Sequence, residues 1–369
     1  MKTIHIFVIL LATAFQASGV EFFDNLIRRA AEEGFENLYM ERGESKAPVL
    51  FYENRVYRDE FYAAAVLLAI CEKELPEAEH IILCRCRNRV PLVELAVDLT
   101  DYRRIVRDGE PMAASEWLTL RSPRHKLPRE AEVREKAAGR FDLILTPGLS
   151  LYLGNYDDRF KAHLQVLPAL STHLWRGGSI MVEAAVPLYS DVNYQSYRFK
   201  SYSQLNRVVL SQFMRLPGNV FLFLHAGAFY PNRWGFGGEA VKWLLHRQLA
   251  LGYRLEYTGF LLYFQNQLYY SQLGLITSRA YLTTWLKPLN MEVTASYNRY
   301  VMKDSGWMLE AMRFYRETGI GAYAGVTQQD KFGGVKVRVA LSRNKRPAPS
   351  VFRIVLPNYY EYAYKATTV

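Results

Sequence analysis

Hydrophobic and polar residues alternate along most of the second half of the chain. From residue 335 to residue 343, valine and leucine fill one set of alternate positions, and lysine, arginine, alanine and serine fill the other. A period of two is typical of a β-strand with one apolar and one polar face. The same pattern, in places weaker or bulged, predicts about 12 strands, at residues 141–153, 160–166, 180–188, 203–215, 219–230, 234–245, 248–258, 271–286, 291–298, 306–316, 320–326 and 335–343.

The length of these runs narrows the fold class. Many extend over ten or more residues, whereas strands in globular sheets usually have about five or six. A strand that crosses a bilayer needs about 9 to 11 residues. The sequence therefore predicts a mainly β protein, with an antiparallel transmembrane β-barrel of about 12 strands over residues 140–369 that ends in a C-terminal tail. A soluble β-sandwich is the alternative, because it is also built from alternating strands.

Aromatic residues favour the barrel. The chain has 26 Tyr and 20 Phe residues, and many tyrosines and tryptophans lie near the predicted strand ends. Tyr and Trp side chains at the two ends of membrane strands form girdles at the lipid–water interfaces. The predicted girdle residues are Trp175, Tyr230, Trp234, Trp243, Tyr263, Tyr269, Tyr270, Trp285, Tyr300 and Tyr315.

The first half of the chain has a different pattern. Apolar residues recur at helical spacing in residues 21–34 and 58–73, and each segment is followed by two short apolar runs that predict a hairpin, at residues 35–52 and 81–99. Two helices on one face of an antiparallel sheet make a small two-layer α+β domain, predicted over residues 20–120. Residues 121–139 are highly charged and contain proline, so they predict a linker or a short surface helix.

Residues 1–19 predict a secretory signal peptide. Lys2 precedes a short apolar run, and small residues precede Val20. After Gly19, no run of about 18 apolar residues predicts a membrane-spanning helix. We therefore expect an exported protein in the outer membrane of a Gram-negative-type bacterium, with its N-terminal domain in the periplasm.

Charge separates the two halves further. From residue 140 onward there are 26 Lys and Arg residues and 13 Asp and Glu residues, which gives this part a net charge of +13. The whole chain has a net charge of +10. Nucleic acid is not an expected partner, because the cations of an exported barrel are spread over its lumen and loops. Outer-membrane lipid and the phosphates of lipopolysaccharide are the nearer anions.

Three cysteines, Cys71, Cys84 and Cys86, lie in the acidic first half. Cys84 and Cys86 are two residues apart on a predicted strand, so they face the same side and cannot easily bond to each other. Either Cys71 forms a disulfide with one of them, or all three are small buried residues. A metal site would need a fourth ligand, for which His80 is the nearest candidate, and neither a metal nor another cofactor is predicted.

Charged residues on the polar faces of the predicted strands are candidates for lining the barrel lumen. An inner wall with both signs of charge could pass a hydrated sugar chain and favour an acidic polymer. Alternatively, these charges pair across a narrow barrel and fill it, with Arg254, Lys336 and Arg338 next to Glu256 and Glu292. The candidates are Lys161, Glu183, Glu239, Arg254, Glu256, Glu292, Lys336 and Arg338.

Two further groups of residues could carry chemistry. Ser171 and His173 share a strand face, and Glu183 lies on the next strand, so these three could act as nucleophile, base and orienting acid of a barrel lipid hydrolase. No catalytic site is predicted, and the hydrolase remains the less favoured alternative. In the first domain, four arginines could form a ligand-facing patch or a solvated, ion-paired surface: Arg55, Arg58, Arg87 and Arg89.

The sequence resembles the YjbH-type exopolysaccharide biosynthesis proteins, which are outer-membrane barrels. The resemblance lies in the order of the parts and in five segments, at residues 53–58, 88–98, 234–239, 319–327 and 333–341. It implies a role in exopolysaccharide or capsule biosynthesis or export, with the barrel as a conduit for the polymer. The implied partners are polysaccharide and periplasmic polysaccharide export proteins. A general diffusion porin is the alternative function.

Overall fold

The structure is a computed structural model that describes residues 23–42, 47–109, 112–128, 133–153, 160–191, 203–230, 232–244, 248–264 and 267–368. The predicted signal peptide lies outside these residues. The chain forms two compact units: unit 1 contains the chain up to Ala137 together with Asn344–Pro349, and unit 2 contains Ala138–Arg343 and Ser350–Val369. Among the described residues, no helix is both long enough and apolar enough to cross a membrane.

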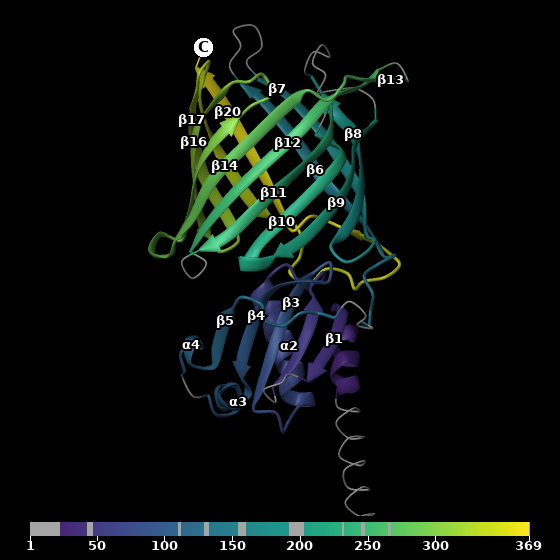
Figure 1. Cartoon of the computed structure of the whole chain (residues 1–369), viewed down its shortest axis with the longest axis vertical. Coiled ribbons are helices and arrows are strands. Elements are labelled where there is room, and N and C mark those ends of the chain that lie inside the picture. The colour runs from purple at the N-terminus through teal and green to yellow at the C-terminus, as the bar shows by residue number, and fades with distance from the viewer. Residues whose placement is uncertain are drawn as a thin grey trace, which may run out of the picture. The chain divides into compact units, whose positions relative to one another are not determined.

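The described residues of unit 1 form a five-stranded sheet with the strand order β1-β2-β3-β4-β5 (Figure 1). Both predicted hairpins are present, and β2 and β3 pair in parallel because α2 connects them. A helix over residues 23–32 and α2 match the two predicted helices. The elements are β1 (Glu36–Arg42), β2 (Pro48–Glu53), α2 (Glu60–Glu74), β3 (His80–Arg87), β4 (Val90–Asp98), α3 (Leu99–Asp108), α4 (Ala114–Trp117) and β5 (Leu118–Arg121). The sequence pattern did not predict α3, α4 or β5.

Aspartate caps fix where the helices of unit 1 begin. The Asp59 side chain accepts hydrogen bonds from the backbone N–H groups of Phe61 and Tyr62 at the start of α2, and Asp98 caps α3 in the same way. The first helix and α2 bury their apolar sides against one face of the sheet. This core includes Leu26, Ala30, Leu50, Tyr52, Leu67, Cys71, Ile81 and Leu83.

The opposite face of the sheet is also covered, which makes a third layer. Leu127 and Val133, from the segment predicted as a linker, pack against Phe51, Ile82 and Cys84. Further along the same segment, Arg134 and Leu38 exchange two backbone hydrogen bonds of 2.8 and 2.9 Å. Where they are described, residues 123–137 are therefore part of unit 1.

Residues 344–349 complete unit 1 although they follow nearly all of unit 2 in the sequence. The backbone N–H of Arg58 donates to the carbonyl of Asn344, and that of Arg346 donates to the carbonyl of Val56, both at 2.8 Å. Lys345 Nζ donates to Glu33 Oε2 at 2.7 Å. This short strap therefore pairs with the chain between β2 and α2.

In the part of unit 2 that the structure describes, the strands form one large sheet of 15 strands. All twelve predicted strands are present, and the residues predicted as a C-terminal tail form two more, β19 and β20. The strands are β6 (Phe141–Leu153), β7 (Phe160–His173), β8 (Gly178–Ser190), β9 (Gln204–Leu216), β10 (Val220–Tyr230), β11 (Arg233–Leu244), β12 (Leu249–Phe264), β13 (Gln267–Tyr270), β14 (Leu275–Leu286), β15 (Met291–Arg299), β16 (Ser305–Tyr315), β17 (Thr318–Thr327), β18 (Lys331–Ala340), β19 (Phe352–Val355) and β20 (Tyr359–Thr368).

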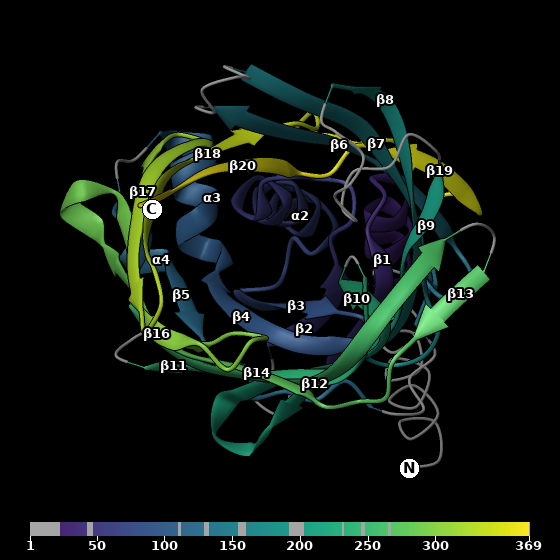
Figure 2. The same ribbon diagram turned by 90° about the horizontal axis from the view of Figure 1, so that it is seen from above.

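The sheet curls so that β6 comes close to β20 (Figure 2). The first residues of β6 pair in parallel with β19, where Arg353 makes a two-pronged ion pair with Asp142 at 2.5 and 3.0 Å. Further along β6, the backbone N–H of Leu149 donates to Tyr360 Oη at 3.2 Å. No β-ladder joins β6 to β20 within the described residues. The last two strands are thus divided between two neighbours: β19 pairs with β6, and β20 pairs with β18.

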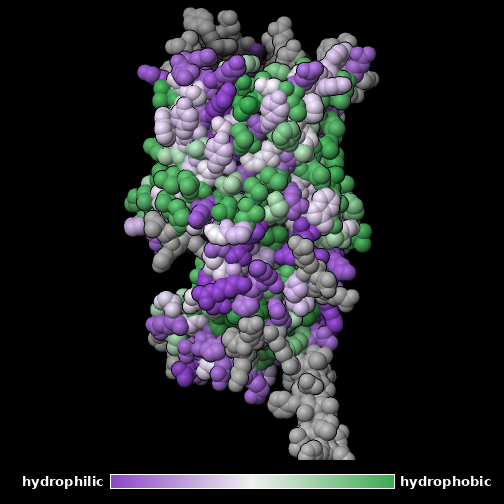
Figure 3. Space-filling model, viewed as in Figure 1, coloured by the Kyte–Doolittle hydropathy of each residue, from purple (hydrophilic) through white to green (hydrophobic). Residues whose placement is uncertain are grey.

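Apolar side chains are exposed over much of the outer face of the curled sheet, and on the side that Figure 3 shows they are interspersed with polar ones. The exposed apolar side chains of this face include Leu164, Leu170, Val182, Leu210, Leu224, Leu255, Leu282, Leu309, Ile320 and Val335. Six predicted girdle residues are exposed: Trp175, Trp243, Tyr269, Tyr270, Tyr300 and Tyr315. Trp234 and Trp285 are half-buried, and the side chains of Tyr230 and Tyr263 lie outside what the structure describes.

Candidate functional site

The inner face of the unit 2 sheet is polar. Glu183, Glu256 and Thr258 are almost completely buried there, on strands whose alternate residues are exposed and apolar. Buried polar groups must find hydrogen-bond partners, so this face forms networks rather than isolated charges. Other buried polar residues of this face are His163, Thr294, Ser296 and Asn298.

A histidine and a carboxylate meet on β10 and β12. His225, Gly237 and Glu256 lie side by side on three neighbouring strands, and His225 Nε2 is 3.7 Å from Glu256 Oε1. A Cβ atom at Gly237 would lie 2.9 Å from His225 Nε2 and 2.8 Å from Glu256 Cγ. Glycine in the middle strand therefore lets the side chains of its two neighbours approach across it. Thr277 on β14 donates to Glu256 Oε2 at 2.9 Å.

The adjacent row carries two arginines and a carboxylate. Arg254 Nη2 donates to Glu239 Oε2 at 2.8 Å, and Tyr281 Oη donates to Glu239 Oε1 at 2.6 Å. Arg279 lies directly opposite Arg254 on β14, and its guanidinium is 5.2 Å from the centre of the Tyr281 ring. A Cβ at Gly252 would lie 2.1 Å from Tyr281 Cζ. This glycine leaves room for the tyrosine to lie across β12.

Aromatic side chains flank His225 on β10. The His225 ring is 5.7 Å from the Phe223 ring and 4.4 Å from the Phe229 ring, centroid to centroid. Phe221, on the same face, stacks on Phe213 of β9 at 6.0 Å. The inner face therefore places aromatic rings beside carboxylates, guanidinium groups and an imidazole. Such a combination of apolar rings and a few polar groups is typical of sites that hold organic ligands.

A second charged cluster lies on β16, β18 and β20. Lys336 Nζ is 2.5 Å from Glu310 Oε1 and 3.6 Å from Glu361 Oε1. The guanidinium of Arg338 lies over the Tyr359 ring, 4.3 Å from its centre. Charge pairing together with ring contacts holds these cations against the inner wall.

The structure places the eight predicted lumen residues on the inner face, and it gives Arg254 and Lys336 other partners than the alternative of a filled barrel predicted. Arg254 pairs with Glu239, and Lys336 pairs with Glu310 and Glu361, whereas the sequence analysis set these cations beside Glu256 and Glu292. Glu292 lies in the same row as Lys336, three strands away. Lys161 lies on the same strand face as buried His163. Partner choice depends on strand register, which alternation within one strand does not reveal.

The predicted triad does not form a connected group around Glu183. Glu183 lies opposite Ala169, not opposite Ser171 or His173. Its carboxylate is bound by both Arg207 Nε, at 2.8 Å, and Arg207 Nη2, and it also accepts from Asn206 Nδ2 at 2.5 Å. Glu183 is therefore the partner of Arg207, which was not among the predicted site residues.

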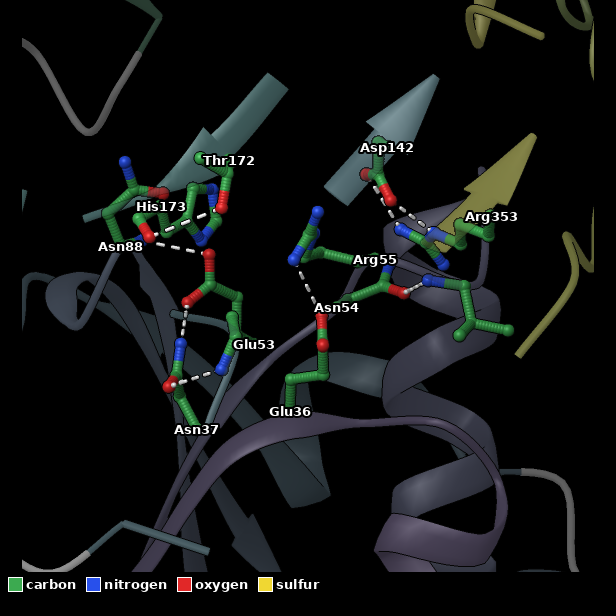
Figure 4. A network of polar contacts seen from close by, with 12 residues as sticks. Glu36, Asn37, Glu53, Asn54, Arg55, Asn88, Asp142, Thr172, His173 and Arg353 are labelled. Atoms are coloured by element: carbon green, nitrogen blue, oxygen red, sulfur yellow. Dashed lines mark hydrogen bonds and ion pairs between the residues drawn. The ribbon is translucent and has the colours of Figure 1, made fainter. Parts of the chain in front are cut away.

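In unit 1, one of the four predicted arginines, Arg55, reaches a buried acidic residue, Glu36 (Figure 4). Arg55 Nη1 is 3.1 Å from the fully buried Glu36. Arg87 and Arg89 flank Asn88 in the turn between β3 and β4, and Arg58 takes part in the strap pairing described above. Arg85, which was not predicted, pairs with Glu60 at 2.5 Å. Ion pairing rather than an open patch therefore describes Arg55 and Arg85.

One buried carboxylate fixes the segment that follows β5. Glu94 accepts hydrogen bonds from the backbone N–H groups of Arg124 and His125, at 2.7 and 2.8 Å, and from Arg121 Nε at 3.0 Å. Burial acts to raise the pKa of Glu94, but these bonds and the His125 ring together hold that pKa below its usual value of 4.5. The charged form of Glu94 is therefore part of the folded structure.

The cysteines are free and buried. Cys71 lies in the core on the helix side of the sheet, while Cys84 and Cys86 lie in the core on the opposite side. The sheet separates them, so the predicted disulfide alternative is wrong in this structure. Among the described residues, no group of three or more His, Cys, Asp and Glu side chains could hold a metal ion.

Several site residues were missed by the sequence analysis. His225, Arg207, Tyr281 and Arg279 lie within predicted strands, and Glu361 lies in the unpredicted β20. Alternation could have placed each of them on a polar face, but only the pairing of neighbouring strands brings them together.

Comparison with known proteins agrees with the resemblance seen in the sequence. A family model described as "Exopolysaccharide biosynthesis protein YbjH" (YjbH) matches residues 21–335, which cover most of the chain and both of its units. No curated protein and no solved structure matches the chain. The predicted family is confirmed: the chain belongs to the YjbH family of exopolysaccharide biosynthesis proteins.

Proposed function

We propose that unit 2 closes as a transmembrane β-barrel in the outer membrane of a Gram-negative-type bacterium and serves as a conduit for an exopolysaccharide. In this proposal unit 1 lies in the periplasm, where it meets periplasmic polysaccharide export proteins. The role is transport rather than catalysis, and Glu183, the acid that a hydrolase would need, is engaged by Arg207 and Asn206.

The observation that carries the proposal is the contrast between the two faces of one curled sheet. Thirteen of its strands have 9–16 residues, which is enough to cross a bilayer. Exposed leucine, isoleucine and valine cover the outer face, while buried Glu, Arg, Thr and Asn occupy the inner face. In water this arrangement would expose a large apolar surface, which is unfavourable in free energy. In a membrane the apolar outer face would contact lipid and the polar inner face would contact water.

The membership of the YjbH family supports the choice of polysaccharide as cargo. A general diffusion porin would share the sheet but would not need a folded unit of the size of unit 1. The two functions differ in the effect of deleting the protein. If the protein is the conduit, its loss should cause the polymer to accumulate in the periplasm.

The first test concerns location. Cells are fractionated, and the protein is run on a gel with and without boiling. We expect outer-membrane recovery and a faster unboiled form, because a closed barrel satisfies its backbone groups internally and resists detergent. Recovery in the detergent-free periplasmic fraction would contradict the proposal.

The second test concerns cargo. A deletion strain is complemented with the wild type, with the double variant Arg254→Gln/Glu239→Gln, or with Lys242→Gln as a control on the outer face of the same strand as Glu239. The double variant removes an ion pair without leaving one partner charged. We expect the deletion to shift polymer from the cell surface to the periplasm, the double variant to do so partly, and the control to behave as wild type. A fall in total polymer without periplasmic accumulation would instead indicate a role in synthesis.

A further inference from the structure

The inner face carries two polar groups that its own residues leave unsatisfied. His225 Nδ1 and Arg279 Nε are both buried, and neither has a hydrogen-bond partner among the described residues. The His225 side chain is 9% exposed. Leaving a buried donor or acceptor unsatisfied is destabilising, and a bound water or ligand is one way in which such an atom is satisfied in a native structure.

Arg279 differs from Arg254, which lies directly opposite it, in its ion-pair partners. Arg254 opposite it has Glu239 as its partner, but no carboxylate among the described residues forms an ion pair with Arg279. Two arginines directly opposite on neighbouring strands repel each other. An anion between or beside them would remove that repulsion, and a guanidinium binds a carboxylate through two parallel hydrogen bonds.

The surroundings of His225 contain groups that can bind a sugar ring. His225 lies between the Phe223 and Phe229 rings, with Glu256 at 3.7 Å on its Nε2 side. An aromatic face suits the apolar C–H face of a pyranose ring, and imidazole and carboxylate groups suit its hydroxyls. His225 and Arg279 stand on β10 and β14, which are three strands apart in the sheet order. At about 4.8 Å per strand, a chain of more than one sugar would reach both.

We propose that the inner wall formed by β10, β11, β12 and β14 binds a saccharide that carries a carboxylate, with Arg279 holding the carboxylate and His225, Glu256 and Phe223 holding a neighbouring sugar ring. This inference rests on the proposed function, and it narrows the cargo to an acidic polysaccharide. Gly237 belongs to the site because a larger residue there would separate His225 from Glu256.

The test is direct binding to the detergent-purified full-length protein, measured by saturation-transfer NMR and calorimetry. The probes are oligogalacturonate, which carries carboxylates, and a maltooligosaccharide of equal length, which does not. We expect the wild type to prefer oligogalacturonate. Arg279→Gln should weaken oligogalacturonate binding about tenfold, the equivalent of about 1.4 kcal/mol, and leave maltooligosaccharide binding unchanged.

Further variants keep the outcome interpretable. Arg279→Lys keeps the charge but loses the two-pronged geometry, and should lie between wild type and Arg279→Gln. His225→Phe should weaken both probes alike. Arg313→Gln, on the exposed outer face of β16, should change neither. Each variant is first checked for the faster unboiled form on a gel.

Two results would overturn the inference: equal binding of oligogalacturonate to wild type and Arg279→Gln, or no binding of either probe. If binding fails while polymer still accumulates in the periplasm of the deletion strain, the conduit stands and only this site is wrong. If the binding pattern is as expected but the deletion leaves surface polymer unchanged, the site stands and the conduit is wrong.

Discussion

Glu53, the last residue of β2, accepts a 2.8 Å hydrogen bond from the backbone N–H of Asn88, in the turn between β3 and β4. Its second oxygen accepts from Asn37 Nδ2 at 2.6 Å. Asn37 and Asn88 both have left-handed backbones, with φ of 51° and 48°, a conformation that asparagine tolerates better than most residues. One buried carboxylate thus joins the two segments, beginning at Glu53 and Asn88, in which the resemblance to the family was first noted.

We expect Glu53→Gln to loosen this turn, because an amide replaces one of the two acceptor oxygens and leaves a buried donor unpaired. The loss should be about 1–3 kcal/mol, seen as faster hydrogen exchange of the amides near Asn88. Glu77→Gln, an exposed position on the same unit, serves as the control. Unchanged exchange near Asn88 would show that the turn does not need Glu53.

The bonds to Glu94 should make the segment after β5 sensitive to acid. A carboxyl group with a pKa below its usual 4.5 contributes stability that is fully present above pH 4.5. That stability is lost as the pH falls through the lower pKa of the folded state. Hydrogen exchange of residues 123–128 should therefore rise steeply below pH 4.5 in the wild type.

In Glu94→Gln, the same segment should exchange rapidly already at pH 7, because Gln cannot pair with Arg121 as a charged group does. The exposed Glu116→Gln should retain the acid-dependent rise. A wild type with flat exchange from pH 7 to pH 3 would contradict the assigned role of Glu94.

A charged substitution on the outer face of unit 2 should destabilise the folded protein in a bilayer. Leu309 is at the middle of β16, 56% exposed, between Ala295 and Ala324 of the neighbouring strands. If it faces lipid, Leu309→Arg should cost roughly 2–4 kcal/mol of folding free energy in bilayers. Met308→Arg, its neighbour on the inner face, should cost less. Equal costs in a lipid-refolding titration would argue against lipid contact.

The cysteines should be unreactive in the folded protein. Burial strongly raises the pKa of the Cys71 thiol, and a protonated, enclosed thiol reacts poorly. A maleimide reagent should therefore label none of the three before denaturation and all three after it. Because the sheet lies between Cys71 and the other two, oxidant should form no disulfide involving Cys71 in the folded state, which mass spectrometry can verify.

The Asp142–Arg353 pair should hold β19 on β6. Asp142→Ala would leave the buried Arg353 guanidinium without its carboxylate, a change that costs about 3–5 kcal/mol in buried pairs. We expect faster hydrogen exchange in residues 351–355 and less of the folded form on unboiled gels. The double variant Asp142→Leu/Arg353→Met should recover most of both. Normal exchange in the single variant would show that the pair is dispensable.

The twelve long strands could be predicted because each shows alternation within its own residues. The faces were also readable: Val335 and Val337 are exposed, and Lys336 lies on the other side. Tyr359–Thr368 alternates as well, with tyrosines at 360, 362 and 364, and could have been recognised as a strand. The partners of Arg254 and Lys336 could not be predicted, since register between strands depends on turn lengths and bulges.

Contacts between segments that are distant in the sequence could not be predicted from the sequence pattern either. Nothing local in residues 352–355 indicates pairing with Asp142, and the polar strap at 344–349 resembles an ordinary loop. In unit 1, the segment predicted as a linker carries only isolated apolar residues, Leu127 and Val133, which have no periodic pattern. Their burial follows from the second apolar face of the sheet, which a two-layer prediction left uncovered.

The strap also determines the order in which the protein can be completed. An N-terminal domain ordinarily folds while the rest of its chain is still being synthesised. Here, Val56 and Arg58 receive their backbone partners from Asn344 and Arg346, nearly 290 residues later in the chain. We therefore expect unit 1 to be completed only after all but the last two strands of the chain are available.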